Sequence, residues 1–231
     1  MNGVVLKRAR SGAGWTQSRL AEELGVTQAY LSLMESGGRR VPPQLARRVA
    51  RLLDLPPTVL PVDTSSTSRR PPTEKWVEAQ LARLGYPGYA FRNRPGAVHH
   101  PEEVLLAGLS LDELDPRLAE ALPWLLLRYE GVDERRLADH AKLGNLQNRL
   151  GFVVALARQA AERNPGFRSR VEGLTRFEEA LEPSRLAREE TLGQPHASGR
   201  LREWLRAERS DTARHWNLLS DLKVEHLPYA A

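Results

Sequence analysis

Apolar residues in the first sixty positions recur at intervals of three and four, the spacing of one face of an α-helix. Small residues interrupt this pattern where helices begin and end. Gly14 closes a first helix, and Thr16 and Thr27 are placed to cap a second and a third. Pro43 opens a fourth helix, since proline is tolerated in a first turn. The pattern therefore predicts a domain of four to five short helices.

The predicted third helix, from Gln28 to about Glu35, has two faces of different character. Its larger apolar side chains fall on one side at 100° per residue. The other side carries small or uncharged side chains: Gln28, Ala29 and Ser32, with Leu33 at the border. A solvated face normally carries Lys or Glu, whereas these side chains suit a face that lies on the edges of DNA bases.

Beyond residue 73 the periodicity stays helical, and no alternating strand pattern appears. The longest apolar stripe consists of Leu146, Leu150, Val153, Val154, Ala157 and Ala161. Pro123 is expected to kink or split its helix. The Gly- and Pro-rich residues 86–101 are expected to be irregular, with a turn or a short hairpin. Residues 74–231 are therefore predicted to be all-helical.

Residues 61–73 are rich in Ser, Thr and Pro and offer nothing to a hydrophobic core. The predicted fold class is thus all-α in two parts: an N-terminal domain over residues 1–62, a linker over residues 63–73 and a helical domain over residues 74–231. Charge separates the same parts. Residues 1–70 carry eleven Lys and Arg against five Asp and Glu, whereas the rest is nearly neutral. The first part is therefore expected to contact a polyanion.

The order of elements in residues 3–60 resembles the phage-repressor (Cro-like, Xre-type) helix-turn-helix family. The matching segments are LKRAR (6–10), GWTQ (14–17), LA (20–21), LGVTQ (24–28), YLS (30–32), ESG (35–37), Ala50 and LL (52–53). The resemblance implies a DNA-binding domain whose third helix enters the major groove. It covers a quarter of the chain.

The resemblance also implies roles for individual residues. Gln17 matches a phosphate contact, and the groove-facing positions are Thr27, Gln28, Ala29 and Ser32. Leu33 stands where relatives carry a polar reader, so it either meets a thymine methyl or packs. Arg39 and Arg40 match a loop that holds the DNA backbone. Arg10 and Glu35 match a pair that bridges the first and third helices and orients the recognition helix.

Other chemistry is weakly indicated. The chain has no cysteine, and the neighbouring His99 and His100 lack a second ligand cluster at metal-binding spacing. No catalytic or phosphate-cradling motif is visible, so no enzyme activity, cofactor or metal is expected. An enzymatic role for residues 74–231 stays a minor alternative. No apolar run is long enough to span a membrane and no signal peptide is recognisable, so a cytoplasmic location is expected.

The leading hypothesis is a sequence-specific transcriptional regulator, a repressor of a palindromic operator in double-stranded DNA. The alternative is an autoregulating antitoxin whose C-terminal domain neutralises a toxin protein. One helix-turn-helix reads few base pairs, so a homodimer held by residues 74–231 is expected. Trp76, Trp124, Trp204 and Trp216 lie on apolar stripes and are expected to be either core residues or anchors of this dimer interface. The apolar C-terminal tail should dock on its own domain or on another chain.

Overall fold

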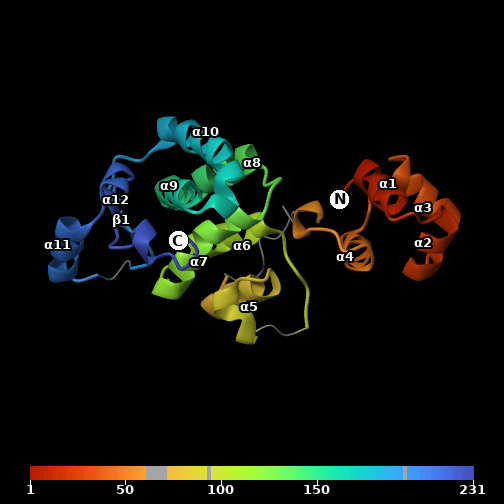
Figure 1. Cartoon of the computed structure of the whole chain (residues 1–231), viewed down its shortest axis with the longest axis horizontal. Helices are drawn as coiled ribbons and strands as arrows, with labels where there is room; N and C mark the ends of the chain where they lie inside the picture. The colour runs from red at the N-terminus through yellow and green to blue at the C-terminus, as the bar shows by residue number, and fades with distance from the viewer. Residues whose placement is uncertain (61–71, 93–94, 195–196) are drawn as a thin grey trace. The chain divides into compact units, whose positions relative to one another are not determined.

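The computed structural model describes residues 1–60, 72–92, 95–194 and 197–231. In these ranges the secondary structure is helical except for one pair of two-residue strands, which confirms the predicted all-α fold class (Figure 1). The chain separates into two compact units. Residues 63–71 of the predicted linker lie outside the described residues, and Thr73 caps the helix that follows by accepting from the Trp76 amide.

The first unit contains α1 (Gly3–Gly12), α2 (Gln17–Leu24), α3 (Gln28–Glu35), α4 (Pro43–Leu52) and the 3-10 turn η1 (Pro57–Val59). Its core is formed by apolar side chains from all four α-helices, among them Leu6, Leu20, Leu24, Leu31, Met34 and Val49. Residues 95–100 also belong to this unit. The ring Nε2 of the buried His100 lies 3.1 Å from the carbonyl oxygen of Thr58.

The helix ends in the first unit follow local rules. Thr16 Oγ1 accepts from the Arg19 amide at 3.1 Å, and Thr27 Oγ1 accepts from the Tyr30 amide at 3.2 Å. These bonds satisfy backbone donors that have no partner inside their helices. Gly25 joins α2 to the turn with φ of 66°, a conformation that costs glycine little because it has no Cβ. The predicted starts of α2 and α3 are confirmed.

The second unit is built around a central helix. Its elements are α5 (Glu74–Arg83), η2 (Pro87–Arg92), α6 (Pro101–Leu109), α7 (Pro116–Arg128), α8 (Glu134–Leu143), α9 (Gln147–Arg163), η3 (Pro165–Arg170), α10 (Val171–Leu181), η4 (Glu182–Ser184), β1 (Glu190–Thr191), α11 (Gly199–Glu208), α12 (Asp211–His215), β2 (Leu218–Leu219) and η5 (Val224–His226). The helices α7, α8, α10 and α12 all contact α9. Consequently α9 is buried around most of its circumference rather than along one stripe.

A close approach fixes the position of Trp216 against α9. Trp216 is fully buried, and a Cβ on Gly151 would lie only 2.3 Å from its ring. The absence of a side chain at Gly151 therefore makes room for the largest side chain of this core. Trp216 is thus a core residue of its own unit, one of the two roles predicted for the tryptophans.

At two places the structure excludes one of two predicted alternatives, and at a third it departs from the predicted pattern. The helix α7 continues through Pro123 and is not split, although the proline supplies no amide to that turn. The described part of residues 86–101 contains the 3-10 segment η2 and no hairpin, so of the two predicted alternatives it agrees with the turn. Two short segments, β1 and β2, pair in parallel, with Glu190 opposite Leu218. Two-residue strands carry too little alternation to be read from a sequence.

The C-terminal tail docks on its own unit. The Tyr229 hydroxyl donates to the Glu120 carbonyl oxygen at 2.6 Å, and Asn164 Nδ2 donates to the carbonyl oxygen of Tyr229 at 2.9 Å. Leu227 is buried. The tail is predicted to dock on its own domain or on another chain, and the structure shows the first of these.

Candidate nucleic-acid interface

The outer face of α3 is accessible and bears no charged side chain. Thr27, Gln28 and Ala29 are exposed, Ser32 is half-buried, and Leu33 is 51% exposed. The hydroxyl of Thr27 serves as the helix cap, so its contribution to this face is mainly its methyl group. The opposite face packs into the core through Leu31 and Met34. The structure thus brings the predicted groove-facing residues together on one surface.

A buried ion pair holds α3 against α1. Arg10 Nε donates to Glu35 Oε1 at 2.6 Å, and Arg10 Nη2 donates to Glu35 Oε2 at 3.0 Å. The side chains of Arg10 and Glu35 are 12% and 2% exposed. Arg10 also donates to the Trp15 carbonyl oxygen at 2.7 Å, which ties the loop before α2 to the same group. The predicted Arg10–Glu35 bridge is confirmed.

Two glutamines extend this ion pair to the protein surface. Gln17 Nε2 donates to Glu35 Oε2 at 2.8 Å, and Gln28 Nε2 donates to Gln17 Oε1 at 3.0 Å. We call Glu35, Gln17 and Gln28 the amide chain. It joins the end of α3 to the starts of α2 and α3, so the exposed Gln28 side chain is held from within the domain.

The carboxylate at the base of the amide chain stays ionised. Burial alone would raise the pKa of Glu35, but the hydrogen bonds from Arg10 and Gln17 outweigh burial and hold that pKa below its usual value. The hydrogen bond to Glu35 raises the pKa of Arg10 against the opposing effect of burial. Both shifts indicate that the charged forms are the favoured ones in the folded domain.

The basic loop after α3 is exposed. Arg39 and Arg40 are both accessible, and the guanidinium carbon of Arg39 lies 5.1 Å from the centre of the Tyr30 ring. The Arg39 amide donates to the Leu33 carbonyl oxygen at 3.0 Å, so the backbone at Arg39 is fixed relative to α3. Two cations are therefore presented beside the uncharged outer face.

Some positioning contacts were not anticipated from the sequence. Arg48 on α4 donates to the carbonyl oxygens of Leu24 and Glu23, both at 3.1 Å, and thereby closes the C-terminal end of α2. The bond between Gln17 and Gln28 is also unanticipated. Each residue stands at a predicted helix start, but nothing in the spacing shows that these two starts meet.

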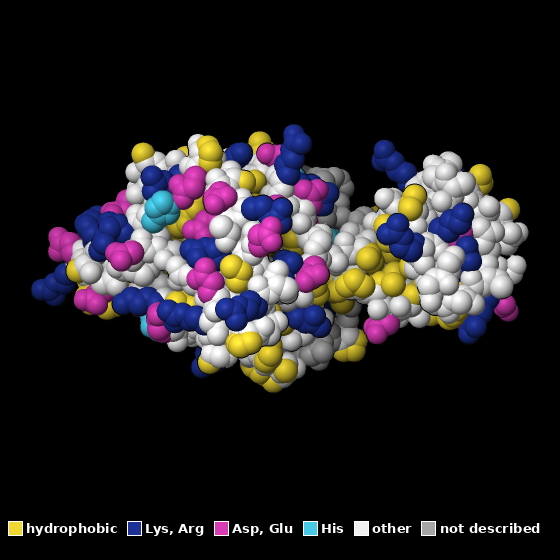
Figure 2. All heavy atoms as spheres, turned by 45° about the horizontal axis from the view of Figure 1, so that its top comes forward, with side chains coloured by type: hydrophobic (Ala, Val, Ile, Leu, Met, Phe, Trp, Pro, Cys, Tyr) yellow, Lys and Arg dark blue, Asp and Glu magenta, His cyan; other side chains and the backbone are white. Residues whose placement is uncertain are grey.

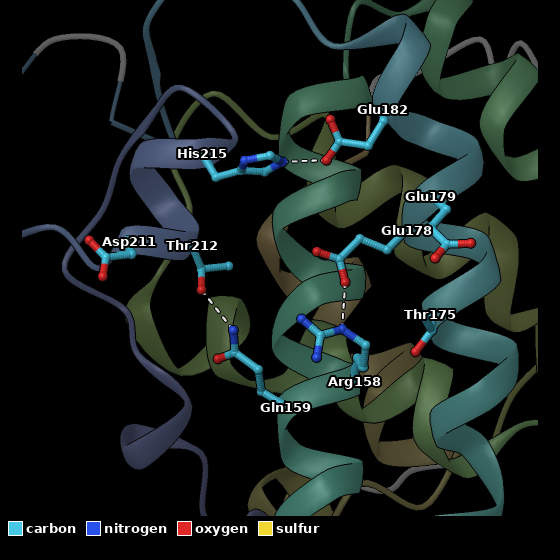
Figure 3. A pocket seen from close by; sticks show the side chains of 9 residues that line it. All are labelled: Arg158, Gln159, Thr175, Glu178, Glu179, Glu182, Asp211, Thr212 and His215. Atoms are coloured by element: carbon cyan, nitrogen blue, oxygen red, sulfur yellow. Dashed lines mark hydrogen bonds and ion pairs between the residues drawn. The ribbon is translucent and has the colours of Figure 1, made fainter.

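The second unit contains a polar pocket of about 410 Å³ between α9, α10 and α12. Figure 3 shows Glu178 directed toward Arg158, Glu182 toward His215, and Gln159 toward Thr212. The Arg158–Glu178 distance is 2.7 Å, as is the Gln159–Thr212 distance. Most of these polar groups are thus engaged with one another, and they join α12 to α9 and to η4, and α9 to α10. On the face in Figure 2, positive and negative side chains are intermixed over this larger unit.

No helix in the described part of the chain combines the length and the apolar composition needed to cross a membrane. No curated protein and no solved structure matches the chain. A family model described as a helix-turn-helix domain matches residues 3–61, about a quarter of the sequence. Residues 3–61, which contain α1 to α4, are therefore a helix-turn-helix segment, and domains of this type bind DNA.

Proposed function

We propose that the chain is a sequence-specific transcriptional regulator, a repressor, that binds a palindromic operator as a homodimer. In this proposal α3 reads bases in the major groove, residues 74–231 hold the two copies together, and the chain acts by binding rather than by catalysis. The observation that carries the proposal is the amide chain, which fixes Gln28 on the exposed, uncharged face of α3.

The remaining hydrogen-bonding groups of Gln28 suit an adenine. A glutamine amide has two N–H donors and one oxygen acceptor, and the bond to Gln17 uses one donor. The other donor and the oxygen match adenine N7 and the adenine N6 amino group. Ala29 and Leu33, exposed on the same face, offer apolar contacts for thymine methyl groups.

Phosphate contacts are assigned to Gln17, Arg39 and Arg40. Gln17 stands at the first position of α2, and its bond to Glu35 uses one of its two N–H donors. The second donor and the backbone N–H groups of this helix start are suited to an anion. Arg39 and Arg40 add positive charge that fixes the register of the domain without reading sequence.

Selection of binding sites from random double-stranded DNA tests the proposal. The full chain is expected to enrich a sequence with two inverted half-sites about 34 Å apart, one turn of DNA. Gln28→Ala should weaken operator binding by about 1–3 kcal/mol and leave binding to random DNA nearly intact. Gln44→Ala is the matched control, because Gln44 is exposed on α4, outside the proposed reading face. Equal loss on operator and random DNA would contradict the assignment.

Repression is tested with a reporter gene placed behind the selected operator. Expression of the wild-type chain should lower reporter output, and Gln28→Ala should restore it. Increased output from the wild-type chain would instead identify an activator, with the DNA-reading surface unchanged.

A second candidate function is an autoregulating antitoxin whose second unit neutralises a toxin protein. The observation that favours it is an exposed apolar pair on α11, Leu201 and Trp204, which is available to a partner. A co-transcribed neighbouring gene whose product arrests growth, and whose toxicity this chain relieves, would support the antitoxin. A neighbour whose product is harmless when expressed alone would support the simple regulator.

A further inference from the structure

One face of α11 is exposed along its whole length. It consists of Arg200, Leu201, Trp204, Ala207 and Glu208, all within about 60° of Trp204 around the helix. We call these five residues the α11 face. Trp204 is 50% exposed and Leu201 is 37% exposed. Large apolar side chains gathered on one helix face indicate a contact surface more strongly than singly scattered ones do.

The opposite side of α11 is anchored to its own unit. Leu205 is buried, and the Glu189 carboxylate binds Arg206 at 2.5 Å and Arg209 at 2.7 Å. Figure 1 shows α11 beside β1 and α12, at an end of the second unit. The α11 face is therefore exposed on a helix that is held in place by its other side.

Two other apolar features of the second unit that could join two copies are used internally. Trp216 and Trp124 are buried, and the C-terminal tail is docked on its own unit. Trp15 and Trp76 are half-buried, so Trp204 is the most accessible of the five tryptophans, all of which lie in the described ranges. Trp204 is thus the largest exposed apolar side chain in the described ranges, and it shares its helix face with Leu201, whereas the exposed Phe91 and Leu143 lie on η2 and α8.

We propose that the α11 face binds the α11 face of a second copy, with the two helices antiparallel and Trp204 near the two-fold axis. Arg200 precedes Trp204 by four residues, and Glu208 follows it by four. An antiparallel arrangement centred on Trp204 therefore sets Arg200 of each copy opposite Glu208 of the other. A parallel arrangement would set like charges opposite each other, so the charge pattern favours the antiparallel arrangement.

The two charged residues are available for this contact. Arg200 and Glu208 are exposed, and neither side chain makes a hydrogen bond or an ion pair with a residue in the described ranges. A two-fold interface requires a surface that is complementary to itself. The α11 face meets this requirement, with an apolar centre and opposite charges at equal distances on either side.

The interface is small, because a ten-residue helix is only about 15 Å long. The dimer is therefore expected to be weak in solution and to be favoured when two inverted half-sites bring the copies together. This inference rests on the proposed homodimer and names the surface that forms it.

Charge reversal in the full chain tests the contact. Arg200→Glu or Glu208→Arg alone sets like charges opposite each other twice in each dimer and should weaken self-association by about tenfold. An equimolar mixture of these two variants restores opposite charges at both sites and should associate like the wild type. The double variant Arg200→Glu, Glu208→Arg should also recover. Sedimentation through a concentration series measures each case, with Arg135→Glu, on the exposed surface of α8, as the control.

The apolar centre is tested with Trp204→Ala, which should weaken self-association by at least about tenfold. Binding to a single DNA half-site should be unchanged in all α11 variants. If half-site binding is absent in the wild type, the proposed function fails. If half-site binding is present but the mixture and the double variant do not recover association, or if the wild type binds a palindrome no more tightly than two separate half-sites, the α11 contact is overturned. Association of the wild type that no α11 variant changes would place the dimer contact elsewhere.

Discussion

The two units each bury a glutamate beside an arginine, but they connect it differently. Glu35 and Glu102 have the same exposed fraction, 2% of the side chain. Glu35 binds Arg10 and then Gln17, which leads to the exposed Gln28. Glu102 binds Arg136 and the Asp133 amide just before α8.

The difference shows how similar ion pairs can serve different purposes. Glu102 accepts hydrogen bonds from Arg136 and from the Asp133 amide, and these bonds fix α8 on α6. In the first unit the same chemistry also sets the orientation of a side chain that can contact DNA. We therefore expect the first pair to influence both stability and DNA affinity, and the second to influence stability alone.

The largest expected effect is from removing each carboxylate. Glu35→Ala leaves Arg10 buried without its charge partner and should destabilise the first unit by about 3–5 kcal/mol. Glu102→Ala should destabilise the second unit by less, about 1–3 kcal/mol, because the Arg136 side chain is 33% exposed and can hydrogen-bond to water instead. Hydrogen exchange measured on peptides from each unit of the full chain separates the two effects. Loss of protection in both units from either variant would show that each ion pair does not act on its own unit alone.

Acid should weaken the first unit through the same group. The pKa of Glu35 is lower in the folded domain than its ordinary value of 4.5, so its stabilisation is fully present above that value. It is lost progressively as the pH falls through the lowered pKa. Stability of the first unit should therefore fall below about pH 4.5, and Glu35→Gln should flatten this dependence. An unchanged acid profile in Glu35→Gln would assign the effect to other carboxyl groups.

The sequence predicts the first unit in more detail than the second for a physical reason. Its helix ends are local: Thr16, Thr27 and Gly25 act on residues within one turn of themselves. The amide chain is not local, because it depends on where the start of α2 meets the start of α3. In the second unit, α9 is buried on most sides because several helices surround it. The apolar periodicity of one helix does not show how many other helices pack against it.

The next effect concerns the middle of the amide chain. Gln17→Ala removes the bonds to Glu35 and Gln28 and should lower operator affinity by about 1–2 kcal/mol while costing the domain less than about 1 kcal/mol. Because Gln17 acts partly through Gln28, the double variant Gln17→Ala, Gln28→Ala should lose less affinity than the two single losses added together. A double-mutant cycle on operator DNA measures this coupling. Strict additivity would mean that the two glutamines act independently on DNA.

The smallest expected effect distinguishes the arginines of the two units. Arg39 and Arg40 are assigned to phosphate contacts. Replacing either with Ala should therefore weaken binding to operator DNA and to random DNA by a similar modest factor. The slope of log K against log salt concentration should fall by roughly one for each contact removed, because fewer counterions are released from the DNA. Arg135→Ala and Arg168→Ala are the matched controls, since both residues are exposed cations of the second unit. A titration at several salt concentrations should give these controls the wild-type slope. An equal change of slope in the controls would show that the second unit also contacts DNA, despite its nearly neutral net charge.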